Sequence, residues 1–218
     1  MSDFVDRQAI LRCRKSVTST GIKGRENIAE NVDANSLPND KFGFRIYGVM
    51  AHLPEPQTSQ VRKFHKLIGA DDLATKPHCS IDKFWGPDDL DAVKSALEKV
   101  ASEHSPFETE FDPTDLRIGK FGCAYGLKHD DDHYSLQAAV EQATIPLSNR
   151  LRAAGSKYWP HTTMVLGVKP EEVPLMEPNL QKVDISGNMR FETISLIGRI
   201  GPSRGGEYQI LETYPLLG

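Results

Sequence analysis

Cysteine is scarce in this sequence: Cys13, Cys79 and Cys123 are the only ones among 218 residues. An odd number of widely spaced cysteines forms neither a CxxC metal pair nor a disulfide framework, which favours a reducing compartment. Long apolar runs are also absent, since none approaches the ~18 residues that a membrane helix needs. Residues 1–15 carry charges throughout and do not resemble a secretory signal. We therefore expect a cytoplasmic or nuclear protein with no membrane partner.

Several nucleotide-binding and metalloenzyme motifs are missing as well. The sequence contains no GxGxxG, GxxxxGK[ST] or HExxH pattern, which argues against the dinucleotide-binding, P-loop and zincin classes. The formal net charge is −4 and the pI is about 6.0, so a broad surface for long DNA is not expected. A small anionic ligand held by a few local groups is compatible with this composition.

The first 41 residues differ in composition from the rest of the chain. Asp3–Val17 has partly aligned apolar residues that predict a short helix, and a polar, turn-rich segment follows it. From Phe42 onward, strand and helix patterns alternate. We therefore expect an N-terminal extension over residues 1–41 and a folded domain over residues 42–218.

Within that domain, the hydrophobic patterns predict a succession of strands and helices. Strands are expected at Phe44–Leu53, His78–Phe84, Trp159–Val168, Met189–Ile200 and Tyr208–Leu216, with two or three more in Phe107–Leu127, broken at Pro113 and around Gly119 and Gly122. Helices are expected at Gln57–Ile68, Pro87–Glu103, Tyr134–Ala154 (interrupted near Pro146) and Pro170–Leu180. A helix, a short strand with a histidine, a second helix and later strands occur twice, which indicates an internal duplication.

The strongest signal is a tetrapeptide pattern that occurs twice. Pro77-His78-Cys79-Ser80 and Pro160-His161-Thr162-Thr163 are both Pro-His-x-Ser/Thr, and each opens a predicted strand. The composition predicts about 0.05 such tetrapeptides by chance, so two copies are not expected without a reason. A proline fits the first residue of a strand, since it lacks the N–H that a central position would need.

The spacing within each motif has a physical meaning. Side chains alternate between the two faces of a strand, so His78 and Ser80 share one face, as do His161 and Thr163. If the two strands face one another, two imidazoles and two hydroxyls converge on one cleft. Hydroxyls and a protonated imidazole donate hydrogen bonds to phosphate oxygens, while a neutral imidazole accepts a proton. This set suits a phosphodiester and needs no metal or other cofactor.

The paired motifs and the surrounding pattern resemble the two-histidine (2H) phosphoesterase superfamily, which includes 2'-5' RNA ligase-like proteins and cyclic nucleotide phosphodiesterases. The resemblance covers roughly Phe42 to Pro215. It implies a bilobal α+β fold: two antiparallel sheets with outer helices, related by a pseudo-twofold axis, with interleaved lobes and the active-site cleft between them. It also implies that His78 and His161 are catalytic and that Ser80 and Thr163 bind phosphate.

The activity that the resemblance implies is metal-independent hydrolysis of a 2',3'-cyclic nucleotide phosphate or of a 2'-5' or 3' RNA-end phosphodiester. The expected partner is a small nucleotide or a short RNA end, bound by a monomer. Alternatives are a nucleotide- or RNA-binding module without turnover and a reversible 2'-5' RNA ligase. Two core histidines beside strand hydroxyls are the structural alternative for the motifs themselves.

Other residues near the motifs have both a functional and a packing interpretation. Tyr158 and Trp159 could stack a base, or pack at the entrance of a strand. Lys76, Lys157 and Arg204 could attract phosphate, or lie in solvent. The segment from His129 to His133 contains two histidines and three aspartates, which could bind a metal, but adjacent loop residues rarely converge on one ion. Its aspartates also suit the N-terminus of the predicted helix that follows.

Overall fold

The computed structural model describes residues 34, 36–70, 76–119, 122–128, 131–151, 157–166, 168–200 and 208–218. The helix predicted at Asp3–Val17, and Cys13 within it, lie outside the described residues. Cys79 and Cys123 are both buried and are not joined in a disulfide. Among the helices of the described residues, none has the length and apolar character to cross a membrane.

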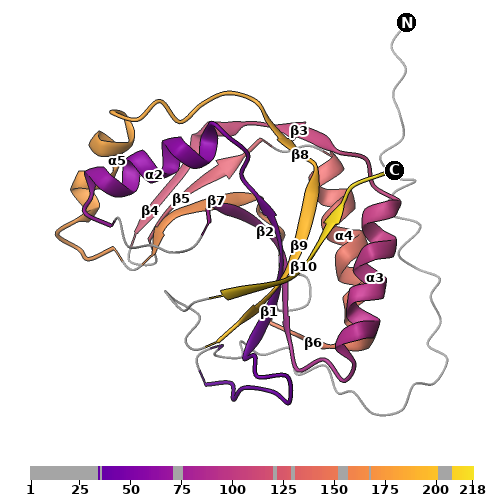
Figure 1. Ribbon diagram of the computed structural model, residues 1–218. Helices are drawn as coiled ribbons and strands as arrows, with labels where there is room; N and C mark the ends of the chain where they lie inside the picture. The colour runs from indigo at the N-terminus through magenta and orange to yellow at the C-terminus, as the bar shows by residue number, and fades with distance from the viewer. Residues whose placement is uncertain are drawn as a thin grey trace, which may run out of the picture.

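The described residues form an α+β fold of antiparallel strands and four α-helices (Figure 1). The helices are α2 (Gln57–Leu67), α3 (Leu90–Ser102), α4 (Asp131–Thr144) and α5 (Val173–Leu180), with a short 3-10 turn at Ile145–Leu147. The strands are β1 (Ile46–His52), β2 (His78–Trp85), β3 (Phe107–Thr109), β4 (Phe111–Gly119), β5 (Gly122–Leu127), β6 (Asn149–Arg150), β7 (His161–Leu166), β8 (Met189–Phe191), β9 (Thr193–Arg199) and β10 (Tyr208–Pro215).

The main sheet has the strand order β10-β9-β1-β2-β7-β5-β4, with β6 paired to β2 off this path. A separate two-stranded ribbon is formed by β3 and β8. The α+β class and the antiparallel pairing that the sequence predicts are therefore confirmed. The structure differs in one respect: the two expected sheets are joined into one, because Cys79 of β2 pairs with Thr162 of β7. The two histidine strands thus lie side by side in the middle of the sheet.

The main sheet has two halves, β10-β9-β1-β2 and β7-β5-β4, and two of the helices pack on the half to which their preceding strand does not belong. Helix α2 follows β1 in sequence but packs on β7, and α5, which contacts α2, packs on β4. Helix α4 follows β5 but packs on β2, beside α3, which also covers β9 and β10 (Figure 1). Each half of the sheet is consequently covered in part by a helix whose preceding strand belongs to the other half. The result is one hydrophobic core that includes residues of both halves.

Helix α3 illustrates why these segments are helical. Its apolar residues Val93, Leu97 and Val100 recur at helical spacing and are buried. The side chain of Asp89 accepts hydrogen bonds from two backbone N–H groups of the first turn, and Asp91 places a second negative charge near the positive end of the helix dipole. The predicted helix at Pro87–Glu103 is confirmed, with its start shifted to this cap.

The expected interruption of helix α4 near Pro146 is confirmed, because proline has no N–H to donate within a helix, but the helix does not resume after it: the chain turns there and Asn149–Arg150 joins the sheet. The strand break expected at Pro113 is wrong. Pro113 does not break a strand but lies inside β4, which is the last strand of the main sheet path and is irregular in register between Phe111 and Leu116. An edge position tolerates a missing donor.

Both histidine strands carry a β-bulge three residues after the histidine. In β2 the register against β1 skips Ile81, and in β7 the register against β5 skips Met164. Helix α2 or α4 contacts each bulge. Nε2 of His65, from α2, lies 2.6 Å from the carbonyl oxygen of Met164, and the hydroxyl of Thr144, from α4, lies 3.4 Å from the Asp82 carboxylate.

The His65 contact gives a stability prediction. His65→Leu keeps the side-chain volume but removes the donor, which leaves the buried Met164 carbonyl without this hydrogen bond. We expect the free energy of unfolding in urea to fall by about 1–3 kcal/mol. Lys66→Leu, on the exposed face of the same helix, is the control and should change stability little. Equal stability of the two variants would contradict a role for this bond.

Candidate active site

The pairing of β2 with β7 places the four predicted residues on one face of the sheet. In the antiparallel register centred on Cys79 and Thr162, His78 lies across from Thr163, and Ser80 lies across from His161. Residues directly opposite one another share a face. The two histidines are then diagonal neighbours, which in such an arrangement lie roughly 7–8 Å apart, with their Cβ atoms somewhat closer.

The burial pattern agrees with this geometry. Cys79 and Thr162 have no exposed surface, while the two histidines and the two hydroxyl residues of the predicted site are partly exposed. The cysteine and the central threonine therefore point into the core beneath the site. The predicted alternation within each motif is confirmed, and the interpretation of His78 and His161 as core histidines is wrong.

Both imidazoles are held by the same local hydrogen bond. Nδ1 of His78 lies 2.9 Å from the carbonyl oxygen of Lys76, and Nδ1 of His161 lies 2.7 Å from that of Trp159. A carbonyl oxygen only accepts, so Nδ1 carries the proton in each ring. In the neutral imidazole this leaves Nε2 as the acceptor. Both histidines thus present a proton-accepting nitrogen at the opposite end of the ring.

The two halves of the site repeat other details of the backbone. The carbonyl of Pro77 accepts from the N–H of Leu53, and the carbonyl of Pro160 accepts from the N–H of Leu127, at 3.0 and 2.9 Å. Each bond links the proline before a motif histidine to the end of the neighbouring strand. Together with the matching bulges, these bonds support the internal duplication predicted from the sequence.

The neighbours of the two histidines differ, however. His52 is the β1 partner of His78, whereas the corresponding partner of His161 on β5 is Gly126. A Cβ at Gly126 would overlap the side chain of Asp115, so this position has no room for a larger residue. One histidine therefore has a second imidazole beside it, and the other has a carboxylate nearby.

The indole of Trp159 lies in a three-membered stack. Its ring is parallel to that of His161, with centroids 4.1 Å apart, and the Arg117 guanidinium lies 3.6 Å from its ring centre. Two groups this close to one ring centre cannot share a face. The indole N–H donates to the Asp115 carboxylate, which also accepts from Arg117. Both faces of Trp159 are covered, and the expectation that it stacks a base is wrong in this arrangement.

Tyr158 is also a packing residue. Only 5% of its surface is exposed, and its hydroxyl lies 3.8 Å from Sγ of Cys79 and 3.4 Å from the carbonyl oxygen of Ser80. Its ring meets that of Tyr134 edge to face. It supports β2 from the core side, so its expected role as a stacking platform is wrong as well.

Lys83 is a site residue that the sequence analysis missed. Strict alternation from His78 would place Lys83 on the core face, but the bulge at Ile81 reverses the alternation. Ile81 and Asp82 are consecutively buried, and Lys83 is exposed on the histidine face. No local sequence pattern marks this bulge, because it depends on the register with β1. Arg199 of β9 and Arg117 of β4 are two further cations near the histidines that the sequence analysis did not select.

These cations and the burial of the rings lower both imidazole pKa values. Burial lowers the pKa of His78 to about 3, and Lys83, His52 and Arg199 add to this. Burial also lowers the pKa of His161 below its usual value; Lys83 and Arg117 lower it further, while Asp115 opposes the shift. Both rings are neutral near pH 7, in a positive environment that favours an anion.

The remaining candidates lie elsewhere. His133 is buried between Phe107 and Phe191, at ring distances of 4.7 and 5.7 Å, so this side chain does not support the metal-binding alternative considered for His129–His133. Within the described ranges, no three His, Cys, Asp or Glu side chains are grouped for a metal ion. His129, Asp130 and Arg204 lie outside the described residues.

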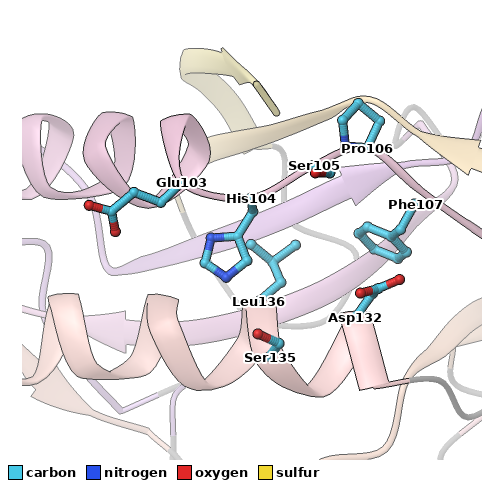
Figure 2. A pocket seen from close by; sticks show the side chains of 8 residues that line it. All are labelled: Glu103, His104, Ser105, Pro106, Phe107, Asp132, Ser135 and Leu136. Atoms are coloured by element: carbon cyan, nitrogen blue, oxygen red, sulfur yellow. The ribbon is translucent and has the colours of Figure 1, made fainter. Parts of the chain in front are cut away.

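A pocket of about 240 Å³ lies away from both motifs, between the end of α3 and the start of α4 (Figure 2). Its lining includes Glu103, His104, Asp132 and Ser135. None of the four motif residues borders it. The candidate active site is therefore the shared face of β2 and β7 and not this pocket.

No family model matches the chain, and no curated protein matches it. Solved structures do. E. coli LigT complexed with 3'-AMP has a TM-score of 0.56 at 13% identity, and the protein TT0787 of Thermus thermophilus has 0.54 at 14%. In both comparisons 79% of this chain and 98% of the other are covered. A structure described as a phosphoesterase has a TM-score of 0.52 at 14% identity, and the comparison covers 79% of this chain and 99% of the other. The predicted resemblance to the 2H phosphoesterases is confirmed at the level of the fold.

The position of Lys83 gives a prediction for anion binding. Lys83→Met removes a cation from the histidine face and should weaken binding of inorganic phosphate, measured by calorimetry, by roughly tenfold or more. It should also raise the pKa of both imidazoles in NMR titrations, because Lys83 lowers both. Lys99→Met, on exposed α3, is the control. Unchanged phosphate affinity in Lys83→Met would show that Lys83 does not contribute to anion binding.

Proposed function

We propose that the protein is a metal-independent phosphodiesterase that hydrolyses a 2',3'-cyclic nucleotide phosphate or a 2'-5' or 3' RNA-end phosphodiester. The observation that carries this proposal is the antiparallel bridge between Cys79 and Thr162, which supports a shared face for two hydroxyls and two imidazoles, each anchored by the same Nδ1 hydrogen bond. A positive environment around them favours a phosphate. General acid–base catalysis by two histidines needs this arrangement and no more.

The unequal surroundings of the histidines suggest unequal roles. His78 lies among cations and has the pKa of about 3, so it is the stronger candidate for the group that is unprotonated at the start, the general base. His161 has the Asp115 carboxylate near it, which favours the imidazolium form. We assign His161 as the general acid, which becomes protonated when the phosphate anion binds.

The reaction then proceeds by in-line attack of water on phosphorus. Nε2 of His78 accepts a proton from the water as its oxygen bonds to phosphorus. The hydroxyls of Ser80 and Thr163 and the ammonium of Lys83 donate to the non-bridging oxygens as negative charge builds on them. Nε2–H of His161 gives its proton to the ribose oxygen as the P–O bond breaks. The product is a phosphate monoester and a free ribose hydroxyl; His78 has gained one proton and His161 has lost one.

The structural comparison supports a nucleotide as substrate but not a particular one. LigT, whose fold this chain shares, was solved with 3'-AMP and with NADP+. Neither Tyr158 nor Trp159 offers an open ring face for a base. Recognition is therefore assigned chiefly to the phosphate and its ribose, which is consistent with a small substrate or the end of a short RNA.

The test is turnover in excess EDTA of 2',3'-cyclic nucleotides and short 2'-5' linked oligonucleotides. Wild type should release product, and His78→Ala and His161→Ala should each lower kcat by about 10²–10⁴-fold, the usual contribution of a general acid or base. His104→Ala, at the remote pocket, is the control and should keep full activity.

Each other outcome favours a different function. Binding of 3'-AMP by wild type without turnover of any substrate would favour the binding module. Joining of a 2',3'-cyclic phosphate end to a 5'-hydroxyl oligonucleotide would favour the RNA ligase. Loss of activity in EDTA, with recovery on addition of metal, would contradict the two-histidine mechanism.

The pH dependence follows from the same assignment. Since His161 must carry a proton, kcat/KM should fall as pH rises through its free-enzyme pKa, which lies below 6.5. His78 must be unprotonated, and its pKa of about 3 puts the acid limb far lower. Bound phosphate favours the imidazolium, so kcat should fall at a higher pH than kcat/KM.

Asp115→Asn tests which histidine is the acid. The substitution removes the charge that raises the pKa of His161, so the fall in kcat/KM should move to lower pH. Asp112→Asn, on the same strand, is the control. An unchanged profile in Asp115→Asn, with catalysis intact, would reverse our assignment of acid and base.

A further inference from the structure

A series of hydrogen-bonded polar groups extends from β10, at the edge of the sheet, to the surroundings of His78. The hydroxyl of Tyr208, from β10, lies 3.3 Å from the carbonyl oxygen of Lys76. The same oxygen accepts the hydrogen bond from Nδ1 of His78. Nε2 of His52 lies 3.4 Å from that hydroxyl. The rings of His52 and Tyr208 are 6.3 and 6.0 Å from the ring of His78. His78 is thus flanked by both.

The series continues behind His52. Nδ1 of His52 lies 3.5 Å from the hydroxyl of Ser195, which lies 3.0 Å from that of Thr213. Three successive strands, β10, β9 and β1, therefore contribute to a single path of hydrogen bonds that ends at the Lys76 carbonyl, the acceptor that His78 shares.

The end of this path determines its direction. The Lys76 carbonyl can only accept, so the Tyr208 hydroxyl donates to it and can then accept from Nε2–H of His52. Nδ1 of His52 is consequently the unprotonated nitrogen and accepts from Ser195. Tyr208, His52 and Ser195 can each act once as donor and once as acceptor, and the Lys76 carbonyl accepts twice, which is the arrangement in which polar groups at a partly buried site are satisfied.

We propose that His52 and Tyr208 are positioning residues that act through the Lys76 carbonyl to hold His78 in the Nδ1–H tautomer, with Nε2 ready to accept the proton of the attacking water. This role rests on the proposed function, but the tautomer is a property of the free protein. With two donors on one carbonyl oxygen, that oxygen is fixed in place and the His78 ring is fixed with it.

The comparison of the two halves argues that this path serves the site rather than the fold. The position equivalent to His52 in the other half is Gly126, and the space there is filled by Asp115. The backbone repeat is maintained without a histidine, so folding of the strand does not require one. Burial, with Lys76 adding to it, lowers the pKa of His52 to about 4, which keeps its ring neutral as the path requires.

The test measures the imidazole nitrogens of His78 by long-range ¹H–¹⁵N NMR in the ligand-free protein, alongside kcat and phosphate affinity. In wild type, His78 should be the Nδ1–H tautomer. Tyr208→Phe should shift His78 toward a mixture of tautomers and lower kcat roughly three- to tenfold, the value of one neutral hydrogen bond, with phosphate affinity unchanged. Tyr214→Phe, on the same strand and remote from the motifs, is the control.

His52 is tested by a conservative pair. His52→Ala should shift the His78 tautomer in the same direction, while His52→Gln, which retains a terminal N–H to donate, should restore most of the wild-type population. The double variant His52→Ala/Tyr208→Phe should resemble Tyr208→Phe alone, because both belong to one path.

The proposal is overturned if the His78 tautomer in Tyr208→Phe equals that of wild type, or if the effects of the two single variants simply add. Neither result depends on turnover. If no substrate of the panel is hydrolysed, the proposed function fails, and the tautomer measurement still decides the role of His52 and Tyr208.

Discussion

The structure depends on one contact above all, the antiparallel bridge between Cys79 and Thr162. It joins the two halves of the sheet in the middle and sets the register in which the motif residues meet. A shift of this register by one residue would turn the motif side chains of one strand to the face opposite those of the other. The buried cysteine and threonine at the bridge are therefore as important to the site as the exposed histidines, although neither can touch a substrate.

Repetition supplies the common features of the site, and departures from the repeat supply its chemistry. Each half contributes a histidine anchored through Nδ1, a hydroxyl and a bulge. Two equal imidazoles could not serve as acid and base in a defined direction. The inequality comes from neighbours that are not repeated, namely Asp115 and Trp159 beside one ring and His52 and Tyr208 beside the other.

Charge is distributed in the same local manner. The chain as a whole is acidic, with a net charge of −4, yet Lys83, Arg117 and Arg199 all act on the motif histidines. In the absence of ligand these cations disfavour imidazolium. A bound phosphate reverses this effect because its negative charge lies among them. In the proposed mechanism, phosphate binding and protonation of His161 are therefore coupled.

The sequence by itself determined the motif strands, their alternation and the residues that share a face, because the two-residue period of a strand is a local property of the backbone. It also indicated the duplication, and the resemblance carried by the paired motifs implied the α+β fold. Only the tertiary structure decided that Lys83 lies on the histidine face and that neither Trp159 nor Tyr158 has an open ring face for a base. It alone also placed His52 beside His78. These outcomes depend on a bulge, a stack and a strand pairing, each made with residues far away in the chain, and no local pattern encodes the partner.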